Sequence, residues 1–563
     1  MCSSSNCSIS VPEWLSEMWT STSYLLNQFK LTNLRHTLYL ISPYETSVPT
    51  LEQVPNYNTQ VCVWWVLLVF LEFTTLWLFG HSDRFALNDS MSSCFRRNAL
   101  SVFQIWRSCR SHFWLRLGLG PFSTHRTPVG FAMDMASLLS YSGKRLFLRH
   151  CSLLFEQDLA YYFGHRAIHE VGFFWGLHTI HHSSEYFNLS TSFRQAAIQD
   201  AGLAAHDILQ ALFIPPPIFL VHRYFSEIFQ FWMHTSLLGS LGPWGFVFNT
   251  PSHHRVHHGR NAYCIDRNFG GVLIIWDRMF GTFEAERMDE PPVYGLIHAE
   301  RSFNQLWLQA CYEKLEEILI GFHSLKELLC DKWRLKDEKG ENVFPGCTDK
   351  LKALLFPPAW LPGVKVRLFF HWASLGRPQP RSTSGQFKTS FAVVIMPTFQ
   401  IELPVQKYDP PLSRWLKAYC LVHFLLLLPM FLQFEYDRGQ FGYVEFSLQL
   451  TFFICTMQSF GAFFDKKKFA PFLETFRLIG FIAYYTTRAV IKPKDVEPTS
   501  ICMVALFFVS AIGWAAILLR HLIRKRAKMA KMRMRFVGWN KSGRPSDVEA
   551  GDKKKWSGRH KCL

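Results

Sequence analysis

Histidines gather in one part of this chain at spacings that could hold metal ions. His165 and His169 form an HxxxH pattern, and two HxxHH patterns follow it. The members of the two later patterns are His178, His181, His182, His254, His257 and His258. Residues three and four apart share one face of an α-helix, so each pattern can direct its rings to a common point. Eight imidazoles exceed the four ligands of a tetrahedral zinc site and suit two metal ions.

The ligand type narrows the chemistry without naming the metal, because imidazole binds iron, zinc, copper and nickel alike. The HExxH zinc hydrolases are excluded, since "HEVGF" at 169–173 has Phe173 where they need a second histidine. The Glu-x-x-His pattern of soluble di-iron bundles is also absent. Neutral histidines leave a pair of metal ions highly positive, and a redox-active pair could activate dioxygen. Because apolar segments flank the histidines, we expect oxidation of a lipid C–H bond.

Four further histidines lie near these patterns. His234, in "FQFWMHTS", fits a ligand and a core residue equally well, and we include it among the candidate ligands. His222 is a weaker candidate, and His253 is expected to be a neighbour of the third pattern. His206 stands alone in an apolar stretch, which is typical of a core or interface residue.

Apolar segments long enough to span a bilayer, which takes roughly 20 residues, flank the histidines. They lie at 61–80, 415–434, 446–464 and 501–519. A fifth, at 201–221, is broken by three prolines, which favours a kinked or re-entrant segment. Hydrophobic residues make up 49% of the chain and charged residues only 18%, which is typical of a surface that partly faces lipid. We therefore predict an all-α, multi-pass integral membrane protein with a helical, cytosol-facing di-metal site.

The net charge of +17 indicates topology rather than nucleic-acid binding. Eight Lys and Arg residues lie between Arg520 and Arg535, directly after the last apolar segment. By the positive-inside rule this tail faces the cytosol, so no nucleic-acid partner is expected. The first ten residues lack the basic and apolar regions of a cleaved signal peptide. The 14 cysteines form no CxxC pair and predict no disulfide framework.

The composition predicts five regions. They are a polar N-terminal lead at 1–60, a membrane catalytic domain at 61–300, a solvent-side amphipathic segment and linker at 301–412, a C-terminal transmembrane block at 413–522 and a basic cytosolic tail at 523–563.

The histidine patterns, set among membrane helices, resemble the fatty acid hydroxylase and sterol desaturase superfamily of integral-membrane non-haem di-iron oxygenases. Three longer stretches resemble its ether-lipid-cleaving branch: "ETSVPTLEQVPNY", "HHSSEYFNLSTSFRQ" and "NTPSHHRVHHGRNAYCIDRNFGGVLIIWDRMFGTFEAE". The similarity covers roughly residues 42–80 and 156–300, with a weaker C-terminal part. One departure is that 94–131 and 140–155 are basic and lack the uninterrupted apolar helices of similar enzymes.

The resemblance implies a tetrahydrobiopterin-dependent enzyme of the endoplasmic reticulum membrane that acts on alkylglycerol ether lipids with dioxygen. It would hydroxylate the carbon next to the ether oxygen, and the hemiacetal would collapse to a fatty aldehyde and a glycerol derivative. Glu170 is implied as an accessory acid, a partner of a ligand or a pterin contact, with a capping or solvent role equally open. The implied ligands of two iron ions are His165, His169, His178, His181, His182, His254, His257 and His258.

Two alternatives remain at this point. Another member of the superfamily, a sterol or fatty acyl hydroxylase or desaturase, would carry the same histidine patterns. A non-catalytic membrane protein that moves or stores metal would also need histidines. The Gly-rich stretch at 259–283 is either an entrance for the pterin or lipid head group or a structural turn, and no short motif marks a pterin site.

Overall fold

The computed structural model describes about two thirds of the chain. The described residues are 29–42, 45, 48, 53–94, 143–196, 210, 216–297, 301–304, 340–356, 362, 401, 404–437, 441–491 and 498–541. These residues are mostly helical, and within them there is no strand, only the isolated bridges Phe248–Leu273 and Gly259–Tyr294. The predicted helical fold class is confirmed.

Four helices of the described part are long and apolar enough to cross a membrane. They are Tyr57–Leu78 in α4, Arg414–Phe431 in α18, Tyr443–Phe464 in α19 and Ile501–Lys531 in α21. Each coincides with one of the four uninterrupted apolar segments seen in the sequence, so the prediction of a multi-pass membrane protein is confirmed. Most of 201–215 and all of 95–142 lie outside the described residues, while α11 (Pro216–Met233) begins at the second of the three prolines.

The chain divides into two compact units. The first contains Met1–Ala470 and Glu497–Thr499, and the second contains Pro471–Val496 and Ser500–Leu563. The five regions predicted from composition do not correspond to these two units, and their boundaries remain predictions.

The membrane helix α4 (Tyr57–Leu78) packs against α11 through aromatic and aliphatic side chains. Asn56 caps α4 by accepting a hydrogen bond from the Thr59 amide. The core that α4 and α11 share also includes the 3₁₀ helix η6 (Leu189–Phe193). Its buried members are Tyr57, Val61, Trp65, Val69, Leu189, Phe193, Val221, Phe225, Ile228 and Phe231.

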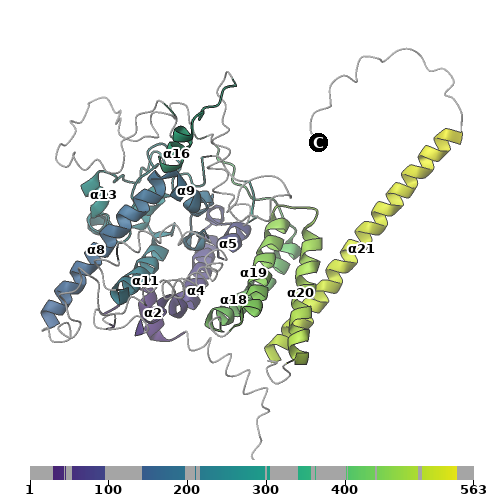
Figure 1. Ribbon diagram of the computed structural model, residues 1–563, viewed down its shortest axis with the longest axis horizontal. Coiled ribbons are helices and arrows are strands. Elements are labelled where there is room, and N and C mark those ends of the chain that lie inside the picture. The colour runs from purple at the N-terminus through teal and green to yellow at the C-terminus, as the bar shows by residue number, and fades with distance from the viewer. Residues whose placement is uncertain are drawn as a thin grey trace, which may run out of the picture. The chain divides into compact units, whose positions relative to one another are not determined.

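The helix α8 (Gly143–Glu170) ends where another helix approaches closely. Val171 has an extended backbone and separates α8 from the next helix, α9 (Gly172–His178). The Gly172 amide donates to the carbonyl of Phe356, which follows α16 (Cys347–Leu355). A Cβ on Gly172 would lie 3.1 Å from two carbonyl oxygens of that segment. The absence of a side chain at Gly172 therefore lets the end of α16 pack against the junction of α8 and α9. Figure 1 shows these three helices next to one another.

The described part of the second unit contains most of α20 (Ala470–Ile491) and of α21 (Pro498–Lys541), the long helix at the yellow end of Figure 1. The Phe481 ring packs on Phe507 with centroids 4.3 Å apart. Glu474 and Arg477 form a buried ion pair on α20.

Candidate metal centre

All of the candidate ligands lie in the first unit, within or beside the ends of helices. His165 and His169 lie on the last turns of α8, and His178 ends α9. His181 and His182 belong to the 3₁₀ helix η5 (His181–Ser183), so the first HxxHH pattern is not one continuous α-helix. The remaining pattern lies on α12 (Pro251–His257), with His258 as its C-cap. Thr250 caps α12 by accepting from the His253 amide, and Pro251 begins the helix.

The nine candidate histidines converge on two neighbouring points. Within each set the ligand atoms lie within 4.8 Å of one another, and every ring is buried. We name the sets the first and the second histidine group. The first group is His165, His169, His178 and His257. The second group is His181, His234, His254 and His258.

His182 lies between the two groups. Its ring stacks on His258 of the second group at a centroid distance of 4.4 Å. It also lies 4.9 Å from His257 and 4.8 Å from His169 of the first group. His257 of the first group and His258 of the second are adjacent in the chain, so the two groups lie side by side at the end of α12.

Backbone carbonyls fix which nitrogen of several rings faces inward. The Nδ1–H of His165 donates to the Phe269 carbonyl at 2.9 Å, and that of His257 donates to Arg267 at 2.9 Å. In the second group, His181 donates to the Arg194 carbonyl at 2.9 Å and His234 donates to Gln230 at 2.8 Å. A carbonyl only accepts, so Nδ1 carries the proton and Nε2 keeps a lone pair.

Several Nε2 atoms of the second group lie close to one another, and a bound cation would pair with the lone pairs that meet there. The Nε2 atoms of His234 and His181 are 3.3 Å apart, and those of His254 and His234 are 3.0 Å apart. Nitrogen–metal bonds of 2.0–2.1 Å give nitrogen–nitrogen separations of about 2.9–3.4 Å in tetrahedral or octahedral sites. The buried Nε2 atoms of His169, His182 and His257 have no hydrogen-bond partner among the described residues. The donor set therefore fits metal ions.

Burial keeps these rings neutral, as ligands must be. It lowers the pKa of His165 to about 4 and that of His234 to about 3. The pKa of His169, His254 and His258 also lies well below its usual value, first because of burial and then because of neighbouring histidines.

The first group rests on a Gly-rich loop held by two buried carboxylates. Asp277, on α13 (Ile275–Phe280), accepts the amides of Phe269 and Gly270 at 2.8 and 2.7 Å. Because the Phe269 carbonyl holds His165, Asp277 fixes that ring indirectly. From α8, Asp158 accepts the amides of Val272 and Leu273 and the Trp276 indole.

Two glycines permit this close approach. A Cβ on Gly270 would lie 2.5 Å from the Leu273 carbonyl oxygen. One on Gly271 would lie 2.8 Å from the Tyr161 ring and 2.9 Å from the Asp158 carboxylate. In this part of 259–283 the structural-turn reading is thus supported.

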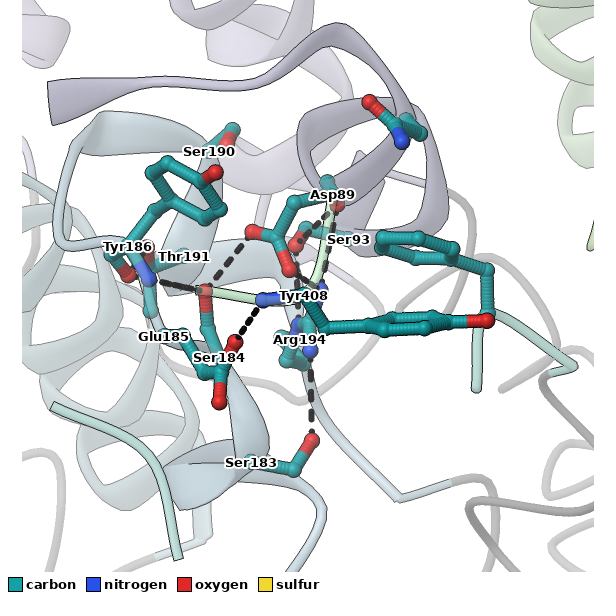
Figure 2. Close-up of polar contacts among 12 residues, drawn as sticks. Asp89, Ser93, Ser183, Ser184, Glu185, Tyr186, Ser190, Thr191, Arg194 and Tyr408 are labelled. Atoms are coloured by element: carbon teal, nitrogen blue, oxygen red, sulfur yellow. Dashed lines mark hydrogen bonds and ion pairs between the residues drawn. The ribbon is translucent and has the colours of Figure 1, made fainter. Parts of the chain in front are cut away.

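The second group rests on a buried ion pair. The Arg194 guanidinium pairs with the Asp89 carboxylate of α5 (Leu87–Cys94) and donates to the Ser93 hydroxyl at 2.9 Å. It also donates to the Ser183 hydroxyl at 3.2 Å. Figure 2 shows this network around Arg194, whose carbonyl accepts from His181. The pair therefore ties α5 to a ring of the second group.

The buried carboxylate of Glu72 and the partly buried one of Glu286 hold the chain just after α11, where His234 lies. Glu72 of α4 accepts from the Thr235 hydroxyl at 2.6 Å and from the Leu189 amide at 2.6 Å. Arg255 pairs with Glu286 at 2.7 Å and donates to the Thr235 carbonyl at 3.2 Å. The chain next to His234 is thus fixed from both sides.

Several other residues, most of them singled out in the sequence, lie near the two histidine groups without belonging to either. Glu170 accepts from the Arg166 guanidinium at 2.8 Å and is in neither histidine group. The carboxylate of Asp266 lies 3.8 Å from Nδ1 of His169, and burial raises its pKa to about 7. His253 is buried beside Phe283 outside both groups, as expected of a neighbour. His222 is buried on α11, and His206 lies outside the described residues.

Reasoning from the sequence did not identify Asp158, Asp277, Asp89, Arg194 or Glu286 as supports. Their partners lie up to 118 positions away, so no local spacing marks them. Glu72 carried a signal, as the one charge of an apolar segment.

Comparisons with known proteins agree with this centre. Residues 151–282 match the family described as fatty acid hydroxylase, and residues 416–498 match the alkylglycerol monooxygenase C-terminal domain. The chain is 49% identical to an alkylglycerol monooxygenase of Caenorhabditis elegans, over 84% of this chain and 86% of the relative. It is 33% identical to the Homo sapiens protein of that name, over 80% of this chain and 87% of the relative. For the Xenopus tropicalis protein the identity is 31%, over 88% and 96%. No solved structure matches the chain.

Proposed function

The chain belongs to the alkylglycerol monooxygenase family, and from that premise we propose that it is a membrane-bound, non-haem di-iron monooxygenase using tetrahydrobiopterin. The substrate is an alkylglycerol ether lipid. One oxygen atom of dioxygen is inserted into the C–H bond next to the ether oxygen, and the other leaves as water. The pterin gives the two electrons, and the hemiacetal then collapses to a fatty aldehyde and a glycerol derivative.

The observation that supports this proposal most is the convergence of nine buried histidines on two adjacent points, with the Nδ1–H groups of four of them held by backbone carbonyls. The residues that would hold the ions are His165, His169, His178, His181, His234, His254, His257 and His258, with His182 between the two histidine groups. Iron, when bound there, supplies the binding and activation of dioxygen.

The residues of the chain have three tasks in this proposal. Carbonyl-anchored Nδ1–H groups hold the imidazoles in one tautomer and orientation. Aromatic rings exclude water, since Trp175 and Phe269 pack 5.0 and 5.2 Å from His169 and Phe187 packs 5.3 Å from His258. Glu170 acts as an accessory acid in the proposal, with its carboxylate oriented by Arg166.

The proposed location is the endoplasmic reticulum membrane, with the histidine groups facing the cytosol. The basic residues between Arg520 and Arg535, in the C-terminal part of α21, support a cytosolic position for that end of the helix, because positive charge accumulates on the cytosolic ends of membrane helices.

A cleavage assay on membranes that express the chain tests the function. We expect fatty aldehyde release from an alkylglycerol with tetrahydrobiopterin, and none without it or with the His182→Ala variant. Aldehyde release that ignores the pterin would contradict the proposal. Hydroxylation of a sterol or fatty acyl chain instead would assign the chain to another activity of the superfamily.

A further inference from the structure

An exposed apolar loop connects His234 to the helix that carries His254, two members of the second histidine group. We name residues 236–247, "SLLGSLGPWGFV", the apolar loop; it contains no charged residue. Its side chains face outward, with Trp244 68% and Phe246 66% exposed. Leu237, Leu238, Leu241 and Val247 are exposed as well. A contiguous exposed patch of this kind marks an interaction surface.

The loop backbone is firmly held, so the exposure is built into the fold. Arg84 donates to the Ser236 carbonyl at 3.1 Å, and Arg255 donates to the Leu238 carbonyl at 2.8 Å. Arg278 donates to the Gly245 carbonyl at 3.1 Å, with its guanidinium 5.2 Å from the Phe246 ring. Three arginines fix the backbone and leave the apolar side chains outside.

The loop begins at the level of the end of a membrane helix. The Thr235 hydroxyl donates to Glu72 at 2.6 Å, and Glu72 lies about 9 Å along α4 before Leu78, at 1.5 Å per residue. Arg84, which donates to the Ser236 carbonyl, ends the short 3₁₀ helix η2 (Ser82–Arg84), six positions after the end of α4. At this end of α4, the apolar residues Trp77, Leu78 and Phe79 are 66–74% exposed. An end of a membrane helix lies at the lipid–water boundary, where aromatic residues collect.

We propose that the apolar loop inserts into the membrane interface and contacts bilayer lipid beside the second histidine group. A lipid surface is the occupant that fits, because the loop shares the level of the exposed aromatic end of α4. His234 precedes the loop by two positions and His254 follows it by seven. The inserted loop would bring this group to the depth of lipid head groups, where an ether bond next to glycerol lies. This consequence rests on the proposed function, while the insertion does not.

Photo-crosslinking tests the insertion without any measure of activity. The full chain is placed in lipid nanodiscs that contain a phospholipid with a diazirine near the glycerol, and labelled peptides are mapped by mass spectrometry. We expect labels on 237–247 as well as on Trp77 and Leu78 at the exposed end of α4, and none at Met288, which is 88% exposed. Labels on α4 without labels on the loop would overturn the proposal. So would crosslinks from the loop to a second copy of the chain, because they would make it a self-association surface.

A paired variant tests the link to the substrate. Trp244→Ser combined with Phe246→Ser should raise KM for an alkylglycerol in vesicles roughly tenfold, because two aromatic side chains leave the interface. Iron content and kcat should stay unchanged, and Met288→Ser is the matched control. An unchanged KM, or a loss of iron, would show that the loop is only structural. If the chain cleaves no ether lipid, the crosslinking result still decides the insertion.

Discussion

The two histidine groups have the same ring chemistry and different supports. The first group is held by a loop that Asp158 and Asp277 fasten to α8 and α13. The second group is held by Asp89 and Arg194, by Arg255 and Glu286, and by Glu72. The second group is thus linked by a hydrogen bond, through Thr235 beside His234, to the membrane helix α4.

This difference indicates that the two ions of the proposed centre can be disturbed separately. Changes in 266–282 should act on the first group, and changes in α5 should act on the second. His182, which touches both, should not discriminate between them.

The largest expected effect comes from removing one ligand of each group. His169→Ala and His254→Ala should each abolish activity and lower the iron content from about two ions to about one, because each group holds its own ion. Iron is measured by mass spectrometry of the purified protein. His253→Ala, a buried neighbour outside both groups, is the control and should keep both ions. Loss of both ions from either variant would mean that the groups form a single site.

Asp277→Asn should weaken the first group. The amide cannot accept both the Phe269 and the Gly270 amide, so the carbonyl that holds His165 shifts, and iron affinity falls by about 10–100-fold. Combined with His254→Ala it should remove the remaining ion. Combined with His169→Ala it should change little, and an equal effect in both backgrounds would contradict separate supports.

Asp89→Asn should have the reverse selectivity with a somewhat smaller effect. Arg194 keeps its bonds to Ser93 and Ser183, so His181 is only partly released, and iron affinity falls by about tenfold. The loss should appear in the His169→Ala background, where only the second ion remains. An effect confined to the His254→Ala background would refute the assignment of Arg194 to the second group.

Gly271→Ala should have the smallest effect, and on stability first. The new Cβ meets the Tyr161 ring at 2.8 Å, so the unfolding free energy should fall by about 1–3 kcal/mol. Thermal unfolding in detergent measures it. Gly480→Ala, where a Cβ meets nothing within 4 Å, is the matched control and should not lower the melting temperature.

The sequence predicted the membrane helices well, because a spanning segment carries its signal within itself. The four apolar segments coincide with the helices, and the prolines of 201–221 interrupt the fifth. The break between α8 and α9 was not foreseen. It depends on α16, which packs over Gly172 from about 180 positions further along the chain.

The histidines were predictable because their spacing is local, and even His234 was included although it stands alone in its segment. The supports were not predictable for the opposite reason. Asp158 looks like an ordinary polar residue of α8 until the fold brings it the amides of Val272 and Leu273, which lie 114 and 115 positions away in the chain. Long-range pairing, unlike periodicity, leaves no trace in one sequence.

Metal analysis of the purified wild-type chain, with X-ray absorption at the metal edge, tests the central claim most directly. The account predicts about two iron ions per chain, each surrounded mainly by nitrogen at about 2.0–2.2 Å. Stoichiometric zinc without iron, in a protein that releases no aldehyde with tetrahydrobiopterin, would contradict it.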